Sequence, residues 1–131
     1  VYEESTNPSG HSSNGKLKSA SEINLAITEM VKTNPYVIFF VFCTHKARIL
    51  KDLKLPESTI YVTSDDGYDG SLETLWLISQ CRHHIITNSS FYWWGAWLSQ
   101  KIYKKVNLCQ DIYLADNFIN KNGLSEGWKT F

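Results

Sequence analysis

The stretch that most constrains the fold of this chain is the segment from Ile85 to Trp97, with the sequence IITNSSFYWWGAW. It reads as a short apolar run, then a small polar group, then an aromatic segment long enough for a helix. We interpret it as the end of a buried strand, a tight turn and the start of a buried helix. Such a junction gathers the unpaired N–H groups of the first helical turn, the positive end of the helix dipole and serine hydroxyls. The pattern predicts an anion site, with phosphate as the commonest occupant.

Helical and strand-like patterns alternate along the chain around this segment. Four helices are expected, over residues 21–33, 45–53, 71–82 and 90–100. Four strands are expected between them, over residues 36–43, 59–63, 84–87 and 104–109. Strands that alternate with helices form a parallel sheet with helices on both faces. The sequence therefore predicts an α/β fold, a Rossmann-like three-layer α/β/α arrangement with a mostly parallel sheet.

The spacing of apolar residues predicts which faces of these elements are buried. Ser21 is expected to cap the first helix, and Asn34-Pro35 to end it. The residues expected to face inward from the first and third helices are Ile23, Ile27, Met30 and Val31, then Leu72, Leu75, Trp76, Ile78 and Ser79. The apolar run 36–43 predicts a strand covered on both faces, and segment 90–100 predicts a helix buried nearly all round. Residues 111–131 look irregular, with a last short helix or strand near Trp128.

Composition limits the classes of function. Residues 1–20, rich in Ser, Gly, Asn and Lys, are expected to be a flexible polar segment, and residues 21–131 a Rossmann-like domain. Thirteen basic residues balance thirteen acidic ones, so the charge does not favour a nucleic acid or an anionic membrane as a partner. No apolar run approaches the ~20 residues that span a bilayer. The three cysteines, which form no C-x-x-C pair, are expected to be reduced and partly buried: Cys43, Cys81 and Cys109.

The functional loops are expected at one edge of the sheet. In parallel sheets ligands bind beyond the carboxyl ends of the strands, which here are followed by loops that begin near Cys43, Thr63 and Thr87. After the last of these, Ser89 or Ser90 would cap the helix while backbone N–H groups bind a phosphate. The alternative interpretation is an ordinary serine cap without a ligand, because serine is a preferred N-cap residue in any helix.

Two other groups of polar residues have a functional and a plain interpretation. Acidic residues follow the second expected strand: Asp65, Asp66, Asp69 and, further on, Glu73. They suit Mg²⁺ or Mn²⁺ beside a diphosphate, or simply a solvated turn. His45 lies at the ligand edge, or equally at an exposed helix start. His83 and His84 are neighbours in a strand and point to opposite faces, so they do not easily share one metal.

Missing motifs exclude several nucleotide-binding and hydrolytic classes. The chain has no G-x-G-x-x-G and no G-x-x-x-x-G-K-[ST], which argues against dinucleotide oxidoreductases and P-loop enzymes. It also has no G-x-S-x-G, which argues against an α/β-hydrolase.

The junction also carries a resemblance to a known family. Residues 88–98, NSSFYWWGAWL, resemble the N-S-[ST]-F-[SG]-W-W-[GA]-A-x-L signature of the α-1,2-fucosyltransferases, glycosyltransferase family 11. Residues 77–86 are similar to the family's L-M-S-x-C-K-H-x-I-I, and residues 39–42 resemble the strand before its S-D-D motif. Residues 124–128 resemble its usual C-terminal ending, so the similarity extends over about residues 21–131.

The resemblance implies an enzyme of the galactoside 2-α-L-fucosyltransferase type. It implies a two-lobed, GT-B-like glycosyltransferase of which this chain is the C-terminal, donor-binding half, with residues 21–131 as its Rossmann-like nucleotide-sugar-binding domain. Such an enzyme transfers fucose from GDP-fucose to the 2-hydroxyl of a galactoside glycan and needs no metal. By resemblance, the donor phosphate would be bound by Asn88, Ser89, Ser90 and Phe91. The nucleotide edge would involve Thr44, His45, Glu73 and Thr87, and no catalytic residue is assigned.

Departures from the family pattern keep other interpretations open. The family's H-x-R-R-G-D motif is absent, Cys43-Thr44-His45 stands in place of S-D-D, and Thr74 stands where the family commonly has Asp. One alternative is a catalytically inactive remnant or interaction domain, and another is a transferase for a different nucleotide sugar. Without an N-terminal lobe, the isolated chain is expected to be inactive. A bacterial type would be cytoplasmic or peripheral to a membrane, and a parent with an N-terminal anchor would lie in the Golgi lumen.

Overall fold

The computed structural model describes residues 18–43, 46, 51–68 and 72–131. Most of the polar segment 1–20 lies outside the described residues, as do residue 44 and, in the expected second helix, residues 45 and 47–50. The division into a flexible segment 1–20 and a domain over residues 21–131 therefore stays a prediction.

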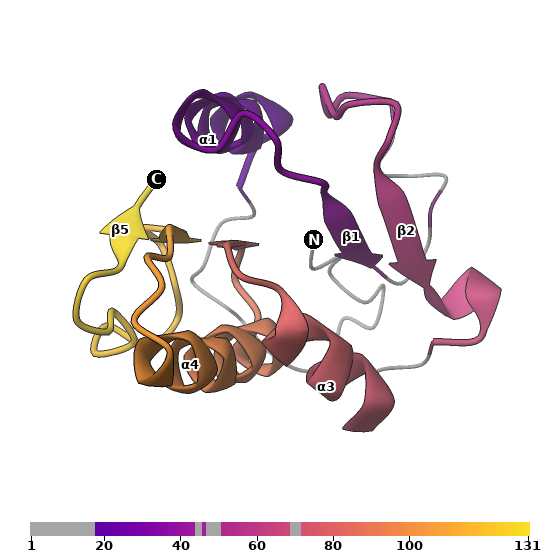
Figure 1. The fold of residues 1–131 in the computed structure, drawn as a ribbon. Coiled ribbons are helices and arrows are strands. Elements are labelled where there is room, and N and C mark those ends of the chain that lie inside the picture. Colours follow the sequence, from indigo (N-terminus) through magenta and orange to yellow (C-terminus); the bar gives the residue numbers. More distant parts are fainter. Residues whose placement is uncertain (1–17, 44–45, 47–50, 69–71) are drawn as a thin grey trace, which may run out of the picture.

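The described chain forms two small parallel sheets. One pairs β1 (Phe40–Cys43) with β2 (Ile60–Thr63), and the other has the order β3 (His84–Ile86), β4 (Ile112–Leu114), β5 (Lys129–Thr130). Figure 1 shows the sheets in one layer, with α1 (Ala20–Thr33) on one side and α3 (Leu72–Gln80) and α4 (Ser90–Lys105) on the other. This confirms the α/β class and the parallel pairing of the strands. The assignment to one lobe of a two-lobed enzyme stays a prediction.

The gap between β1 and β3 divides the layer. The two strands are neighbours in Figure 1, but each pairs only with strands of its own sheet. Across the gap, the strand order is β2-β1-β3-β4-β5. From β1 the chain adds β2 toward one edge of the layer, and from β3 it adds β4 and β5 toward the other, so the order of the strands reverses between β1 and β3. In open α/β sheets this reversal point is where ligands bind, at the carboxyl ends of the strands.

Helix α1 begins with a capping box at Ser19 rather than at Ser21. The Glu22 amide donates to Ser19 Oγ (3.3 Å), and the Ser19 amide donates to Glu22 Oε2 (2.9 Å). The S-x-x-E spacing selects Ser19, because only a glutamate at the third helical position reaches back to the cap residue. The prediction that Ser21 caps this helix is wrong, whereas the end at Asn34 is confirmed.

The buried stripe of α1 is narrower than expected. Ile23, Ile27 and Met30 are buried as predicted, together with Ala26. Val31, expected to face inward, is 37% exposed. It follows Met30 directly, and neighbouring residues on a helix point about 100° apart, so a stripe centred on Met30 leaves Val31 at its edge.

Strand β1 is shorter and more open than the apolar run predicts. Phe40 and Ile60 are register partners at the amino-terminal end of the pair, and they are 47% and 46% exposed. Cys43 and Thr63, the partners at the carboxyl end, are 4% and 0% exposed. The expectation of a strand covered on both faces is therefore wrong for its first half. Packing concentrates at the carboxyl ends, which is where the junction lies.

Helices α3 and α4 pack tightly against each other through Gly95. A Cβ atom built on Gly95 would overlap the Cγ2 atom of Ile78, so the close approach requires glycine. The buried side of α3 carries Ile78 and Ser79, as expected, with Thr74 in addition. Leu72 and Trp76 are 84% and 61% exposed, so the expectation that they face inward is wrong. The contact at Ile78 sets the rotation of α3 and turns these two large residues to its outer side.

Helix α4 continues further than expected, to Lys105, and the predicted strand at 104–109 does not exist. The last turn carries Lys104 and Lys105, which suit the negative end of a helix dipole. Its outer side bears Trp94, which is 52% exposed, so burial all round is wrong in part. The fourth strand is β4 instead, and all three of its residues are buried.

The main core lies between α4 and the second sheet. Its buried members are Ile86, Ala96, Ile112, Leu114, Phe118 and Trp128. Tyr92, Trp93 and Trp97 pack against this cluster from α4. The tail forms a short strand, β5, directly after Trp128, as the sequence predicted in part. Among the described residues, no helix is both long enough and apolar enough to cross a bilayer.

Candidate functional site

The site is built where β3 ends and α4 begins. Ile86 is the last residue of β3, Thr87 and Asn88 form the turn, and Ser89 occupies the N-cap position of α4. The Ser89 amide donates to the Thr87 carbonyl oxygen (2.9 Å), which tightens the turn. The strand, turn and helix therefore lie as the sequence predicted, at the carboxyl edge of the sheet.

The N-terminus of α4 is left open by its own residues. Ser89 has extended backbone (φ −138°, ψ 118°), but its side chain accepts no hydrogen bond from the helix. The amides of Ser90, Phe91 and Tyr92 occupy the first turn, and no described residue accepts a hydrogen bond from them. In helix α1, in contrast, the Glu22 amide of the first turn donates to Ser19 Oγ, and Glu22 Oε2 accepts from the Ser19 amide. With respect to the described residues, helix α4 thus presents free N–H donors and the positive end of its dipole, which together favour an anion.

Thr87 adds a buried hydroxyl to the same point. Its side chain is 9% exposed, and its Oγ1 atom has no hydrogen-bond partner among the described residues. Leaving such a group unsatisfied costs about 1–3 kcal/mol. A ligand with oxygen or N–H groups beside the helix N-terminus would satisfy both the hydroxyl and the free amides.

Asn88 holds the site in place through its side-chain carbonyl. Its Oδ1 atom accepts a hydrogen bond from the Ile119 amide (3.0 Å). Two more bonds join α4 to the segment that follows β4: Trp93 Nε1 donates to the Gly123 carbonyl (2.6 Å), and Gln100 Nε2 donates to the Glu126 carbonyl (3.0 Å). These bonds run along the helix and fix the position of its first turn. The side-chain carbonyl of Asn88 is therefore engaged in holding this segment, and the predicted binding of the donor phosphate by Asn88 stays a prediction.

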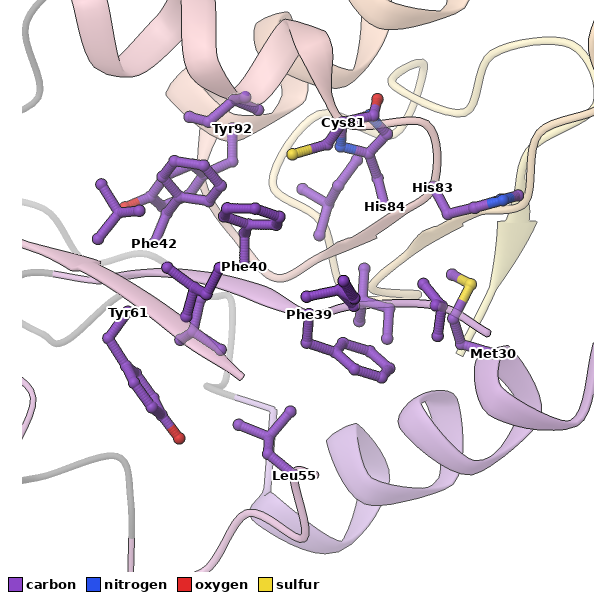
Figure 2. Close-up of a pocket in the computed structure, with 18 of the residues that line it drawn as sticks. Met30, Phe39, Phe40, Phe42, Leu55, Tyr61, Cys81, His83, His84 and Tyr92 are labelled. Carbon is purple, nitrogen blue, oxygen red and sulfur yellow. The ribbon is translucent and has the colours of Figure 1, made fainter. Parts of the chain in front are cut away.

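A cavity of about 620 Å³ lies beside the junction, between the first sheet and β3. Its lining is mostly apolar and comes from α1, β1, β2, α3 and β3, and it includes Thr87 and Tyr92 at the ligand edge. Figure 2 shows Tyr92 extending from α4 toward Phe42 of β1, with Phe40 beside them and Met30 near the other end. The size and apolar lining are those of small-molecule sites.

The other predicted site residues lie apart or outside the described residues. Thr44, His45 and Asp69 are not described. Glu73 is exposed in the first turn of α3. Asp66 accepts a hydrogen bond from Thr63 Oγ1 (2.8 Å), and Asp65 accepts one from the Lys46 amide (3.2 Å). The described residues contain no group of three or more His, Cys, Asp or Glu side chains placed to hold a metal.

The two neighbouring histidines are part of the scaffold. His84 is buried, its Nε2 lies 2.9 Å from the Cys81 carbonyl, and burial lowers its pKa to about 4. The Asp111 amide donates to His83 Nδ1 (3.0 Å), and burial also lowers the pKa of His83. Burial raises the pKa of the Cys81 thiol to about 11. Both histidines belong to the amino-terminal end of β3, at the opposite edge from Thr87.

Sequence reasoning missed Tyr92. It was not among the predicted site residues, although its place in the first turn of α4 sets it beside the open helix N-terminus and its side chain lines the cavity. The spacing of a helix was the signal available, but it does not show which neighbour a side chain meets. Thr74, which stands where the family commonly has Asp, has a buried hydroxyl (5% exposed) without a partner among the described residues.

The fold and the site together define an α/β protein with parallel strands and an open helix N-terminus at the reversal point of its strand order. Comparison with known proteins gives the family. The model of glycosyl transferase family 11 matches residues 15–130, and the chain belongs to this family of glycosyltransferases. This confirms the resemblance that the junction carried.

Two curated relatives from Escherichia coli match part of the chain. An alpha-1,2-colitosyltransferase is 39% identical over 66 residues, which is 47% of this chain and 21% of the relative. The O-antigen biosynthesis glycosyltransferase WbnK is 37% identical over 54 residues, which is 37% of this chain and 18% of the relative. The matched region spans about a fifth of the length of each relative. No solved structure matches the chain.

Proposed function

We propose that this chain binds the sugar-nucleotide donor of an α-1,2-glycosyltransferase, with GDP-fucose as donor and the 2-hydroxyl of a galactoside as acceptor. The observation that carries the proposal is the open first turn of α4 beside the Thr87 hydroxyl, neither of which has a hydrogen-bond partner within the described part of the chain. The donor's diphosphate would accept hydrogen bonds from the amides of Ser90, Phe91 and Tyr92. The hydroxyls of Ser89, Ser90 and Thr87 would complete the cradle.

The chemistry of sugar transfer fits a site of this kind. The diphosphate leaving group gains negative charge as the glycosidic bond breaks. Fixed N–H dipoles at the helix N-terminus are oriented before the reaction, so they stabilise the transition state more than the ground state. Within this proposal, the charge on the diphosphate is balanced by the helix N-terminus and by groups outside this chain, and no metal or cofactor is required.

A second donor is favoured by one relative. The name alpha-1,2-colitosyltransferase supports the α-1,2 linkage but gives colitose as the sugar transferred. A colitose nucleotide is therefore the alternative donor. The site itself does not discriminate between the two sugar nucleotides, because its N–H and O–H groups face the diphosphate that both share.

The same site allows binding without catalysis. The matched region covers 21% of the colitosyltransferase, so the acceptor site and the cationic groups that neutralise a diphosphate would come from other parts of a longer enzyme. We therefore expect the 131-residue chain to bind the donor and not to transfer its sugar. Fucose transfer to lactose by the purified chain would show that this expectation is wrong.

A proline substitution tests the anion site directly. Ser90 is the first residue of α4, a position that proline tolerates, and the extended backbone of Ser89 suits a residue before proline. Ser90→Pro removes the N–H and the hydroxyl of Ser90 from the cradle while keeping the helix, and Ser90→Ala removes the hydroxyl alone. Loss of each hydrogen bond to a charged group, about 1.5–3 kcal/mol, predicts GDP binding weaker by about tenfold to a hundredfold in calorimetric titration, so Ser90→Pro should weaken it more than Ser90→Ala.

Helix α1 supplies the matched control for this substitution. Ala20 occupies the same first position of α1, behind an extended Ser19 (φ −67°, ψ 154°). Ala20→Pro makes the same backbone change at a helix whose N-terminus is capped by its own side chains, so GDP affinity should stay unchanged. Equal weakening by both substitutions, or no GDP binding by the unmodified chain, would refute the proposed site.

A further inference from the structure

We propose that the side of α3 and α4 that faces away from the sheets docks on an anionic membrane surface. This outer face is defined by five residues, which are Leu72 and Trp76 of α3 and Trp94, Lys101 and Lys105 of α4. The inference goes beyond the proposed function and does not depend on it, since no residue of the outer face belongs to the open first turn of α4 or lines the cavity.

Helix α3 turns its largest apolar side chains away from the rest of the chain. Leu72 and Trp76 are four residues apart, so they lie one above the other on the same side of the helix. Both are largely exposed, whereas Thr74 and Ile78, which lie on another side, are buried. Figure 1 shows α3 beside α4 on one side of the sheets, with no described element on the far side of the pair. The large apolar groups of α3 therefore face outward, uncovered by any described element.

Helix α4 continues the outer face with aromatic rings and lysines in contact with one another. The ring of Trp94 packs edge-on against Trp97, with 5.6 Å between centroids, and Lys101 Nζ lies 4.7 Å from the centroid of the Trp97 ring. Trp94, Lys101 and Lys105 follow one another at helical spacing and share one side of the helix. The buried Ala96 lies on the opposite side. Indole rings and ammonium groups thus form one continuous exposed stripe along α4.

Positive charge is concentrated on these two helices although the chain as a whole is neutral. They carry three exposed lysines, Lys101, Lys104 and Lys105, and a single carboxylate, Glu73. Lys104 Nζ lies 4.0 Å from Glu126 Oε2, but both groups are exposed, so water screens the pair. The helix dipole accounts for lysines in the last turn of α4, but not for Lys101 or for the exposed tryptophans. A net charge summed over the whole chain hides this local excess.

This combination of side chains fits a bilayer surface better than a protein partner. Protein interfaces are enriched in aromatic residues but depleted in lysine. At a membrane both residue types are favourable, because indole rings sit at the level of the headgroups while lysines bind anionic phosphates and lay their alkyl stems along apolar surface. No described helix is long and apolar enough to cross a bilayer, so the outer face would lie on the membrane surface.

The test is the partition of the full 131-residue chain onto vesicles, measured by co-sedimentation. One set of vesicles is phosphatidylcholine mixed with phosphatidylglycerol, and the other is phosphatidylcholine alone. We expect binding to the anionic vesicles that weakens as NaCl is raised, and much weaker binding to the neutral ones. Replacing both Lys101 and Lys105 by Gln should lower the partition coefficient by about twentyfold, or about fivefold for each lysine. Trp76→Gln should lower it by about tenfold, because the indole no longer leaves water.

Matched substitutions on the other side of the sheets are the control. Lys32 lies in the last turn of α1 and Tyr36 follows that helix, and both side chains are exposed. Figure 1 shows α1 on the side of the sheets opposite α3 and α4. Lys32→Gln and Tyr36→Gln remove the same kinds of group from there, so they should leave the partition coefficient unchanged. Thermal unfolding measured by circular dichroism checks that every variant remains folded.

Three results would overturn the proposal. The first is equal partition onto the two kinds of vesicle, or none onto either. The second is an equal loss of binding in folded variants on both sides of the sheets. The third is a dimer in sedimentation velocity that Trp76→Gln abolishes, because the outer face would then bind a second copy of the chain. None of these results bears on GDP binding, so the proposed donor site would stand or fall separately.

Discussion

Gly95 of α4 lies directly against Ile78 of α3, so closely that a Cβ atom on Gly95 would meet both Cγ2 and Cβ of the isoleucine. The contact lies one and a half turns beyond the open N-terminus of α4. It fixes the distance and rotation between the two helices on that side of the sheets. The first turn of α4, which carries the anion site, therefore rests on a helix pair held by this glycine.

The contact predicts the sign of the stability change caused by Gly95→Ala, because packing and helix propensity would change the stability in opposite directions. Gly→Ala in an exposed helix position stabilises a protein by up to about 1 kcal/mol. At Gly95 the added methyl group would push against Ile78, and overpacking of this kind costs about 1–3 kcal/mol. We expect Gly95→Ala to lower the melting temperature measured by circular dichroism. An increase in melting temperature would show that the helices do not approach as closely as described.

The cap of α1 predicts a dependence of stability on acidity. Hydrogen bonds from the Ser19 side chain and amide, and then the Lys18 ammonium, lower the pKa of Glu22 from 4.5 to about 2. Because the folded pKa is below the unfolded one, the stabilisation is complete above pH 4.5 and is lost as the pH falls toward 2. Glu22→Gln should remove this part of the acid sensitivity in urea unfolding measured across that range. An unchanged slope between pH 4.5 and 2 would contradict the prediction.

His84 predicts a second pH dependence, at higher pH. Burial lowers its pKa from 6.5 to about 4, although the hydrogen bond with the Cys81 carbonyl acts in the opposite direction. The unfolded chain therefore binds a proton before the folded chain does, and stability falls as the pH drops from 6.5 to 4. The difference between these pKa values corresponds to roughly 3 kcal/mol at most. In His84→Gln, whose amide can still donate to Cys81, the loss of unfolding free energy over this range should become smaller. The prediction fails if the variant and the unmodified chain lose equal amounts.

The sequence was sufficient for the junction and insufficient for what surrounds it. The change from apolar strand to polar turn to aromatic helix is local, and β3, Thr87 and the first turn of α4 lie where that change predicts them. Thr87 follows the carboxyl end of β3, as predicted, and its contact with a nucleotide stays a prediction. The cavity between β1 and β3 was not predicted, because it depends on how far apart two separately paired sheets settle. No periodicity in the chain reports that separation.

The errors in the elements have local physical causes. Val106 and Leu108 alternate with polar residues, which is the pattern of a strand. Helix α4 nevertheless continues without interruption to Lys105, past residue 104, where the strand was predicted to begin. On α3, Leu72 and Trp76 are four residues apart and share one face of the helix. Thr74 and Ile78, the residue that contacts Gly95, are also four residues apart and share another face. The close contact between Gly95 and Ile78 determines which face is buried. This tertiary contact outweighs the greater hydrophobicity of the exposed face.

Two threonines at the carboxyl edge of the strands provide the sharpest test of the site, because their hydroxyls differ in hydrogen bonding. Thr63 Oγ1 donates to Asp66 Oδ2 (2.8 Å), whereas Thr87 Oγ1 is buried without a partner among the described residues. Thr63→Val should cost about 1.5–3 kcal/mol of unfolding free energy, since it breaks a bond to a charged group. Thr87→Val should leave the stability of the ligand-free chain unchanged or raise it by up to about 1 kcal/mol, because it removes an unsatisfied polar atom.

The same pair should show the reverse order in ligand binding. If the Thr87 hydroxyl is completed by the donor, Thr87→Val should weaken GDP binding by about tenfold, the loss of one hydrogen bond. Thr63→Val should leave GDP affinity unchanged, since its hydroxyl is already satisfied by Asp66. Calorimetric titration and urea unfolding of both variants give all four values. A Thr87→Val variant that is less stable and binds GDP normally would mean that the hydroxyl serves the fold, and the anion site would then rest on the amides of α4 alone.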